Sequence, residues 1–409
     1  MLLFLAAQAG VSQVVSEWRG IGRTGIYPET GLMKEWPTGG PEKVWVAGEL
    51  GTGYSSPAFG ERYIYVTGRR DSVEMITALD YRGNRIWQQD FGRSWTGSYP
   101  ETRTTPTIDN GKLYVISGMG EVACHDALTG SRIWYRDVYT ELSGQCNLYG
   151  VSESPRVVDD KVFYTPGGYE TSMVALIKHT GELIWKTRSL ADSAAYVSPI
   201  HINHNGQKMI INLMGNILFG VDPSNGNILW EFDYLALKGP VENPYLKVTN
   251  CNTPIYFKGE IFVTKGYNHP SAMFRLNEAG NGITLKWTNT LLDTHFGGNV
   301  LIDGHLYGST WINNGNGNWA CIDWQTGSDR WEAPMNNKGS IIAADSMLYL
   351  YDEKRGDLAL VRPDPSRLDI VSSFRVTDGN GPHWSHPVIH DGRLYVRHGD
   401  KLIAYRVRK

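Results

Sequence analysis

A large aromatic residue recurs at nearly even spacing along most of this chain, and this repeat constrains the fold more than any other feature. Successive positions lie 42 to 57 residues apart, at Trp45, Trp87, Trp134, Trp185, Trp230, Trp287, Trp331 and Phe374. A period in the forties, built from short apolar runs, is typical of a β-propeller in which each repeat forms one four-stranded blade. We therefore expect an all-β fold.

One unit illustrates the pattern. Residues 105–108, 112–116 and 121–126 are short β-forming runs, and a fourth run begins at 131–134. Turn sequences separate them, including Asp109-Asn110-Gly111 and Leu128-Thr129-Gly130. Such runs and turns indicate antiparallel hairpins. The Trp in each unit is interpreted as a packing anchor between adjacent blades, because its large ring suits the gap between two sheets.

The last unit determines the number of blades. It starts at His386-Pro387, has room for three strands, and has no Trp after it. The missing strand is available at residues 43–46 near the other end of the chain. Pairing of the two chain ends would close the ring and remove an exposed edge. The sequence thus predicts an eight-bladed propeller of four-stranded antiparallel blades over residues 43–409, preceded by a lead-in segment (11–42) that packs on it.

The first ten residues favour export. Residues 2–7 are an apolar run, and small residues follow it. We interpret residues 1–10 as the remnant of a signal peptide and expect a periplasmic or secreted location, the alternative being an ordinary disordered start. No other stretch is long enough to span a membrane.

Charge and cysteine content exclude several classes of protein. The formal net charge is −3 and charged residues make up 20% of the chain, so no basic surface indicates binding of nucleic acid. The four cysteines form no C-x-x-C pair, which leaves a redox motif or a cysteine metal cluster without support.

The repeat resembles that of proteins with pyrroloquinoline-quinone-like (PQQ-like) propeller repeats. The resemblance rests on small polar residue–Pro openings such as Ser56-Pro57, on the Tyr-Val of the second strand, and on the A-x-D-x-x-T-G-x-x-x-W pattern. Residues 78–87, 125–134 and 322–331 follow that pattern most closely. It covers almost all of the chain from Trp45 onward.

The resemblance implies three kinds of function. Long members are quinoprotein alcohol or sugar dehydrogenases that hold the quinone and calcium on the ring axis, and others are non-enzymatic scaffolds such as the lipoprotein propeller of outer-membrane assembly. Many short secreted members have no assigned activity. This chain lacks the adjacent cysteine pair that covers the quinone, has no C-x-x-C-H haem motif, and has no Cys after its apolar start. The sequence therefore requires no cofactor, although PQQ with calcium stays open.

Propeller geometry predicts where a site would lie. The connections from fourth to first strand, and from second to third, share one face and line the axial funnel. Polar and aromatic residues converge there, as a site for a small polar molecule requires. The selected residues are His295, His383, His386, Arg103 and Lys338 as candidate catalytic groups, and Tyr54, Glu153, Tyr196, Asn252, Trp384 and Trp311 as candidate ligand-binding groups.

Roles follow from side-chain chemistry. A histidine would act as general base, and Arg103 with Lys338 would hold a carboxylate or a developing negative charge. Tyr54 and Trp384 would stack on a sugar ring or planar cofactor, while Glu153 with Asn252 would offer oxygen ligands to calcium. Three alternatives stay open: the polar groups satisfy strand ends and channel water, Arg103 and Glu153 form a structural ion pair, and the Asn/Gly-rich loop 311–319 is ordinary turn chemistry.

Three functions therefore remain. The first is a protein that binds, and if the site is catalytic acts on, a small polar ligand such as a carbohydrate. The second is a quinoprotein dehydrogenase, and the third is a non-enzymatic scaffold for protein partners.

Overall fold

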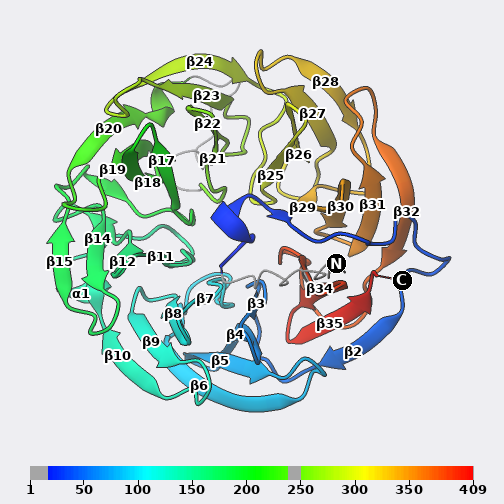
Figure 1. The fold of residues 1–409 in the computed structure, drawn as a ribbon, viewed down its shortest axis with the longest axis horizontal. Helices are drawn as coiled ribbons and strands as arrows, with labels where there is room; N and C mark the ends of the chain where they lie inside the picture. Colours follow the sequence, from blue (N-terminus) through cyan, green and yellow to red (C-terminus); the bar gives the residue numbers. More distant parts are fainter. Residues whose placement is uncertain (1–16, 238–249, 409) are drawn as a thin grey trace, which may run out of the picture.

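The computed structural model describes residues 17–237 and 250–408. Its strands form eight blades arranged radially around one axis, with the first strand of each four-stranded unit toward the axis and the fourth outermost (Figure 1). The predicted all-β, eight-bladed propeller is confirmed. The predicted signal peptide (1–10) lies outside the described residues.

Blades 1 to 4 follow one another along the chain. Blade 1 contains β3 (Ala58–Phe59), β4 (Ile64–Arg70), β5 (Val73–Leu79) and β6 (Arg85–Arg93). Blade 2 contains β7 (Thr107–Asp109), β8 (Lys112–Ile116), β9 (Val122–Asp126) and β10 (Arg132–Arg136). Blade 3 contains β11 (Arg156–Val158), β12 (Lys161–Tyr164), β14 (Val174–Ile177) and β15 (Leu183–Lys186). Blade 4 contains β17 (Ile200–His204), β18 (Gln207–Leu213), β19 (Ile217–Val221) and β20 (Ile228–Asp233).

Blades 5 to 8 complete the ring. Blade 5 contains β21 (Ile255–Phe257), β22 (Glu260–Val263), β23 (Ser271–Leu276) and β24 (Ile283–Asn289). Blade 6 contains β25 (Asn299–Ile302), β26 (His305–Ser309), β27 (Trp319–Asp323) and β28 (Asp329–Ala333). Blade 7 contains β29 (Gly339–Ala344), β30 (Met347–Asp352), β31 (Asp357–Arg362) and β32 (Asp369–Arg375). Blade 8 contains β33 (Val388–His390), β34 (Arg393–His398), β35 (Lys401–Arg406) and β2 (Lys43–Ala47).

Short elements lie between or beside the blades. The loops of blade 3 add a two-stranded ribbon of β13 (Gly167–Gly168) and β16 (Asp192–Ser193). The short helices are α1 (Val138–Glu141), η1 (Ile21–Arg23) and η2 (Tyr234–Ala236). Among the described residues, no helix is long and apolar enough to cross a membrane.

The two ends of the chain close the ring as predicted. Strand β2 pairs antiparallel with β35, with Trp45 opposite Ala404 and Val46 opposite Ile403. A second N-terminal strand, β1 (Ile26–Tyr27), pairs in parallel with β29 and makes blade 7 five-stranded. The sequence analysis did not predict this strand, because two residues carry no periodic signal.

The recurring tryptophans lie between blades, as interpreted from the sequence. The rings of Trp45, Trp87, Trp134, Trp185 and Trp287 pack over the glycine in the turn between the third and fourth strands of the next blade. A Cβ on Gly83 would lie 2.8 Å from Trp45, and one on Gly130 would lie 2.7 Å from Trp87. The indole N–H groups of Trp45, Trp134, Trp185, Trp287 and Trp331 donate to backbone carbonyls of the next blade. The repeat spacing is thus the spacing of one inter-blade contact.

An N-terminal segment enters the centre of the ring. Figure 1 shows the dark-blue turn of η1 near the axis. Arg19 donates to the carbonyls of Ile341 and Asn299, in blades 7 and 6, while Arg23 donates to those of Ser154 and Pro155, which precede blade 3. Both guanidinium groups are buried. The segment therefore bridges opposite sides of the ring.

Candidate functional site

A cavity of about 260 Å³ lies at the ring axis. Its walls come from the connections between fourth and first strands and between second and third strands, as propeller topology predicts; only Trp18 comes from the N-terminal segment. The lining residues are Trp18, Tyr54, Tyr99, Arg103, Tyr149, Ser152, Ser154, Tyr196, Ser198, Cys251, Tyr267, His295, Phe296, Asn314, Glu353, Trp384 and His386. Six of the eleven residues selected from the sequence are among them: Tyr54, Arg103, Tyr196, His295, Trp384 and His386.

The aromatic side chains of this cavity form a continuous belt. Adjacent ring centroids lie 4.6 to 6.0 Å apart along the series Tyr196, Tyr149, Tyr99, Trp384, Phe296, His295 and Tyr267. Trp384 also contacts Tyr54 at 4.9 Å. Edge-to-face and tilted contacts at these separations are favourable. The belt draws on six different blades, so closure of the ring assembles it.

The N-terminal segment contributes both an aromatic wall and a buried cation. The Trp18 ring meets the His386 ring edge-on at 5.2 Å. Arg19 Nη1 donates to His386 Nδ1 at 2.8 Å, and His386 Nε2 lies 3.1 Å from the carbonyl oxygen of Phe296. Because an arginine can only donate, Nδ1 is the acceptor and Nε2 carries the proton. Both ring nitrogens are engaged and burial holds the pKa of His386 well below its usual range, so the arrangement does not support a general-base role.

Arg103 is the cation of the cavity wall. It donates to the carbonyl of Tyr149 at 2.5 Å and to that of Tyr99. It forms no ion pair with any of the residues that the structure describes, so the considered pairing with Glu153 is not formed. Glu74 and Glu101 are nearby carboxyl groups, but burial raises the pKa of Glu74 to about 8. Burial also lowers the pKa of Arg103, which remains a cation near neutral pH.

His295 differs from His386 in its surroundings. Its ring contacts Tyr267 at 4.6 Å and Phe296 at 5.3 Å. Burial, with a smaller contribution from Lys338, lowers the pKa of His295 to about 3. The imidazole is therefore neutral at ordinary pH, with one donor and one acceptor nitrogen.

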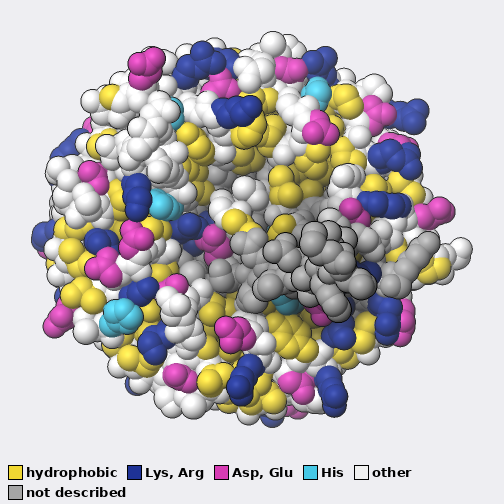
Figure 2. All heavy atoms as spheres, in the orientation of Figure 1, with side chains coloured by type: hydrophobic (Ala, Val, Ile, Leu, Met, Phe, Trp, Pro, Cys, Tyr) yellow, Lys and Arg dark blue, Asp and Glu magenta, His cyan; other side chains and the backbone are white. Residues whose placement is uncertain are grey.

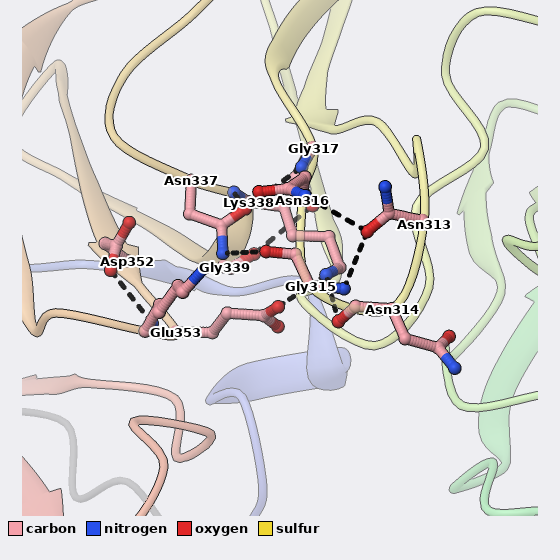
Figure 3. A network of polar contacts seen from close by, with 12 residues as sticks. Asn313, Asn314, Gly315, Asn316, Gly317, Asn337, Lys338, Gly339, Asp352 and Glu353 are labelled. Carbon is pink, nitrogen blue, oxygen red and sulfur yellow. Dashed lines mark hydrogen bonds and ion pairs between the residues drawn. The ribbon is translucent and has the colours of Figure 1, made fainter.

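A buried ion pair within blade 7 lies against a loop of blade 6 (Figure 3). Lys338 Nζ contacts Glu353 Oε1 and donates to the carbonyl of Asn314 at 2.9 Å. Glu353 Oε2 is buried without a hydrogen-bond partner, and this side chain lines the cavity. Burial raises the pKa of Glu353, an effect that the Lys338 cation opposes. Lys338 is thus compensated by a carboxylate, which leaves it poorly suited to the predicted role of holding a ligand's negative charge.

The Asn/Gly-rich loop between the two tryptophans owes its shape to its own amides. Asn313 Oδ1 accepts from the Gly315 N–H at 2.9 Å, and Asn337 clamps the loop by donating to the Gly315 carbonyl and accepting from the Gly317 N–H (Figure 3). Asn314 alone among these asparagines lines the cavity. The alternative that this loop reflects ordinary turn chemistry therefore accounts for most of it.

The other selected residues lie outside the cavity lining. His383 is buried between blades 7 and 8, where its ring stacks on His398 at 3.7 Å and its Nδ1 lies 2.5 Å from the Tyr351 hydroxyl. The prediction that it faces the funnel is wrong, because its ring turns into the interface between sheets. Trp311 packs behind Tyr267 at 5.0 Å.

Glu153 and Asn252 do not form a calcium site. Glu153 Oε2 accepts from the Thr165 N–H at 3.2 Å, and burial raises its pKa to about 8. Asn252 donates to two backbone carbonyls and accepts from the Gly298 N–H at 2.9 Å. Calcium takes about six to eight oxygen ligands. No group of three or more His, Cys, Asp or Glu residues in the described ranges could hold a metal ion. With the buried Arg19 cation near the axis, the residues present do not fit a calcium–quinone pair.

Eleven lining residues were not among those selected from the sequence, and Trp18, Tyr99 and Glu353 illustrate the reasons. Trp18 lies outside the repeated units, so the repeat spacing gave no indication of its position. Tyr99 lies four positions upstream of the selected Arg103, in the connection before blade 2, and Glu353 lies in a connection between second and third strands. The topology rule could have found the last two if it had been applied to every such connection.

Comparisons with known proteins agree with the fold. Residues 72–331 match the PQQ-like repeat family described as outer membrane protein assembly factor BamB. The BamB of Moranella endobia is 19% identical over 292 residues, 68% of this chain and 71% of that protein. A quinoprotein ethanol dehydrogenase of Pseudomonas aeruginosa is 26% identical over 137 residues, 30% of this chain and 21% of the dehydrogenase. These matches confirm the resemblance to PQQ-like propeller repeats.

A solved structure shows the same architecture. The crystal structure of BamB from Moraxella catarrhalis has a TM-score of 0.66 at 12% identity and covers 90% of this chain and 99% of that one. At this identity the likeness shows the fold alone.

Proposed function

Because the chain belongs to the family described as outer membrane protein assembly factor BamB, we propose that it is a non-enzymatic periplasmic scaffold that binds protein partners. The family match over residues 72–331 is the observation that carries this proposal. The buried state of the selected histidines also supports it, since neither His383 nor His386 is free to move a proton.

The partner surface is proposed to be the loop-bearing face. Large apolar side chains are exposed there, in connections between fourth and first or between second and third strands: Tyr99, Leu148, Tyr169 and Ile312. In the view of Figure 2, charged side chains of both signs are interspersed around the ring. Contact through exposed apolar side chains, rather than through one sign of charge, suits a protein partner.

Site-directed photo-crosslinking tests this proposal in the intact protein. A photoreactive phenylalanine analogue at Tyr169 or Ile312 should crosslink one defined protein of the cell envelope. The same analogue at Asn110, in an exposed turn between the first and second strands of blade 2 on the opposite face, should not. Equal crosslinking from both faces, or none from the loop-bearing face in cells that express the protein normally, would contradict the scaffold function.

A second candidate function is the binding of a small polar ligand such as a carbohydrate in the axial cavity. The aromatic belt and the polar groups between its rings favour it. This candidate does not compete with the first, because the cavity and the exposed rim share only Tyr99 among the residues named for each. A quinoprotein dehydrogenase activity is not proposed, since the donor set does not fit the calcium–quinone pair.

A further inference from the structure

We propose that the axial cavity binds an acidic monosaccharide, a pyranose ring that carries one carboxylate. This inference rests on the second candidate function and names its ligand class. Four properties of the cavity lead to it: its charge, its aromatic wall, its neutral polar groups and its size.

The lining carries one cation that forms no ion pair in the described ranges, although the carboxyl groups of Glu74 and Glu101 lie near enough to act on it. Glu353 is paired with Lys338, whereas Arg103 is paired with no carboxylate within the described ranges. The hydrogen bonds of Arg103 to Tyr149 and Tyr99 use two of its five N–H groups. The remaining donors suit a carboxylate, which a guanidinium binds more strongly than it binds a neutral oxygen. The cavity is therefore expected to bind an anionic ligand more tightly than a neutral one.

The aromatic belt suits a saturated ring. Trp384 contacts Tyr54, Tyr99 and Phe296 at 4.9, 5.3 and 5.9 Å, so its position is held from three sides. A pyranose presents C–H groups on its ring faces, and an aromatic side chain covers such a surface at little entropic cost. The wall would thus bind the ring while Arg103 binds the carboxylate.

The neutral polar groups suit hydroxyls. The His295 imidazole offers one donor and one acceptor, the unpartnered Glu353 Oε2 is an acceptor, and the Asn314 side chain offers both. A flat aromatic acid would leave the buried Glu353 oxygen unsatisfied, which is unfavourable. Hydroxyl groups on a saturated ring would satisfy it.

The size of the cavity limits the ligand to about one ring. Pockets for drug-sized molecules have volumes of roughly 300–1,000 Å³. At about 260 Å³ this cavity is smaller. A single monosaccharide is the size class that fits.

Calorimetric titration of the intact protein tests the inference, with glucuronate, glucose and benzoate as probes. Glucuronate should bind, and glucose and benzoate should each bind at least tenfold more weakly. Arg103→Gln should remove the preference for glucuronate over glucose. Arg85→Gln, which removes the same charge from an exposed ion pair with Glu49, should keep it. Thermal unfolding of each variant checks that it is folded.

Each other outcome contradicts the inference in its own way. Equal affinity for glucuronate and glucose overturns the acidic class but keeps a ligand-binding function. Stronger binding of benzoate than of glucuronate overturns the assignment of the ligand as a sugar. If none of the three probes binds at millimolar concentration, both the inference and the proposed binding of a small polar ligand are overturned. The scaffold function is tested separately, by the crosslinking experiment. If Arg103→Gln does not fold, the comparison of the three probes on the unsubstituted protein decides by itself.

Discussion

Arg19 and His386 are separated by 367 positions in the sequence, yet Arg19 Nη1 lies 2.8 Å from His386 Nδ1 near the centre of the ring. The same guanidinium donates to the carbonyls of Asn299 and Ile341. It is buried against Gly25 and Gly298, at both of which a Cβ would lie 2.2 Å from an Arg19 nitrogen. One side chain thus ties blades 6, 7 and 8 to the N-terminal segment.

Replacement of Arg19 should destabilise the protein strongly. Arg19→Met leaves buried carbonyls and the His386 nitrogen without a donor, and we expect a loss of about 3 kcal/mol or more in the free energy of unfolding. Urea unfolding followed by tryptophan fluorescence measures it. Arg85→Met, at an exposed ion pair, should cost less than about 1 kcal/mol. Equal losses in the two variants would contradict the role of Arg19 in holding the ring.

The contact between tryptophan and turn glycine can be tested with two glycines of one blade. Gly130 and Gly111 have nearly equal positive φ angles, +75° and +74°. A Cβ at Gly130 would lie 2.7 Å from Trp87, whereas one at Gly111 would meet nothing within 4 Å. Gly111→Ala should therefore lower the free energy of unfolding by about 1 kcal/mol, the cost of a positive φ angle in a residue with a Cβ. Gly130→Ala should lower it by about 1–3 kcal/mol more, because its Cβ also meets the Trp87 ring. Thermal unfolding of both variants measures the difference, and equal melting temperatures would show that the ring contact is unimportant.

Buried Glu153 should make stability depend on pH. Burial raises the pKa of Glu153 from 4.5 to about 8, although Thr165 and Arg23 oppose this. The folded protein therefore binds a proton that the unfolded chain releases, and stability falls as pH rises from about 4.5 to 8. Unfolding measured at pH 6.5 and 8 should show a smaller fall for Glu153→Gln than for the unsubstituted protein. An unchanged difference would mean that Glu153 ionises normally in the fold.

His295 should stay neutral through the physiological range. Burial lowers the pKa of His295 to about 3, so the folded protein resists a proton that the unfolded chain takes up near 6.5. The sign is opposite to that for Glu153: this contribution to stability is present above pH 6.5 and is lost as the pH falls toward 3. Nitrogen chemical shifts of the His295 ring should show no titration between pH 5 and 8. Protonation in that range, absent when His295 is replaced by Gln, would refute a neutral imidazole at the cavity.

The fold could be predicted because its main contact repeats. At five junctions between blades the tryptophan of one blade meets the turn glycine of the next, and both residues are spaced by the length of a blade. The strand predicted at 112–116 agrees with β8, and the predicted 43–46 with β2. Strand β1 and the N-terminal segment in the ring could not be predicted in this way, because they occur once and their partners lie hundreds of residues away.

The candidate site was only partly predictable. Topology alone indicates the face on which the connections gather, and Arg103, His295 and Trp384 do line the cavity. Topology does not indicate where each side chain points. His383 and His386 are three residues apart, but the first turns toward Tyr351 and His398 between two blades, and the second toward Arg19 near the axis.

The amino-acid sequence by itself determined the number of blades, the pairing of the chain ends and the face that carries the loops, since these follow from local β-strand periodicity and turn chemistry. Tertiary structure decided which side chains share the cavity and which of them are charged. Those properties depend on the burial and the partners that each group acquires only when the ring closes and brings distant segments within a few ångströms.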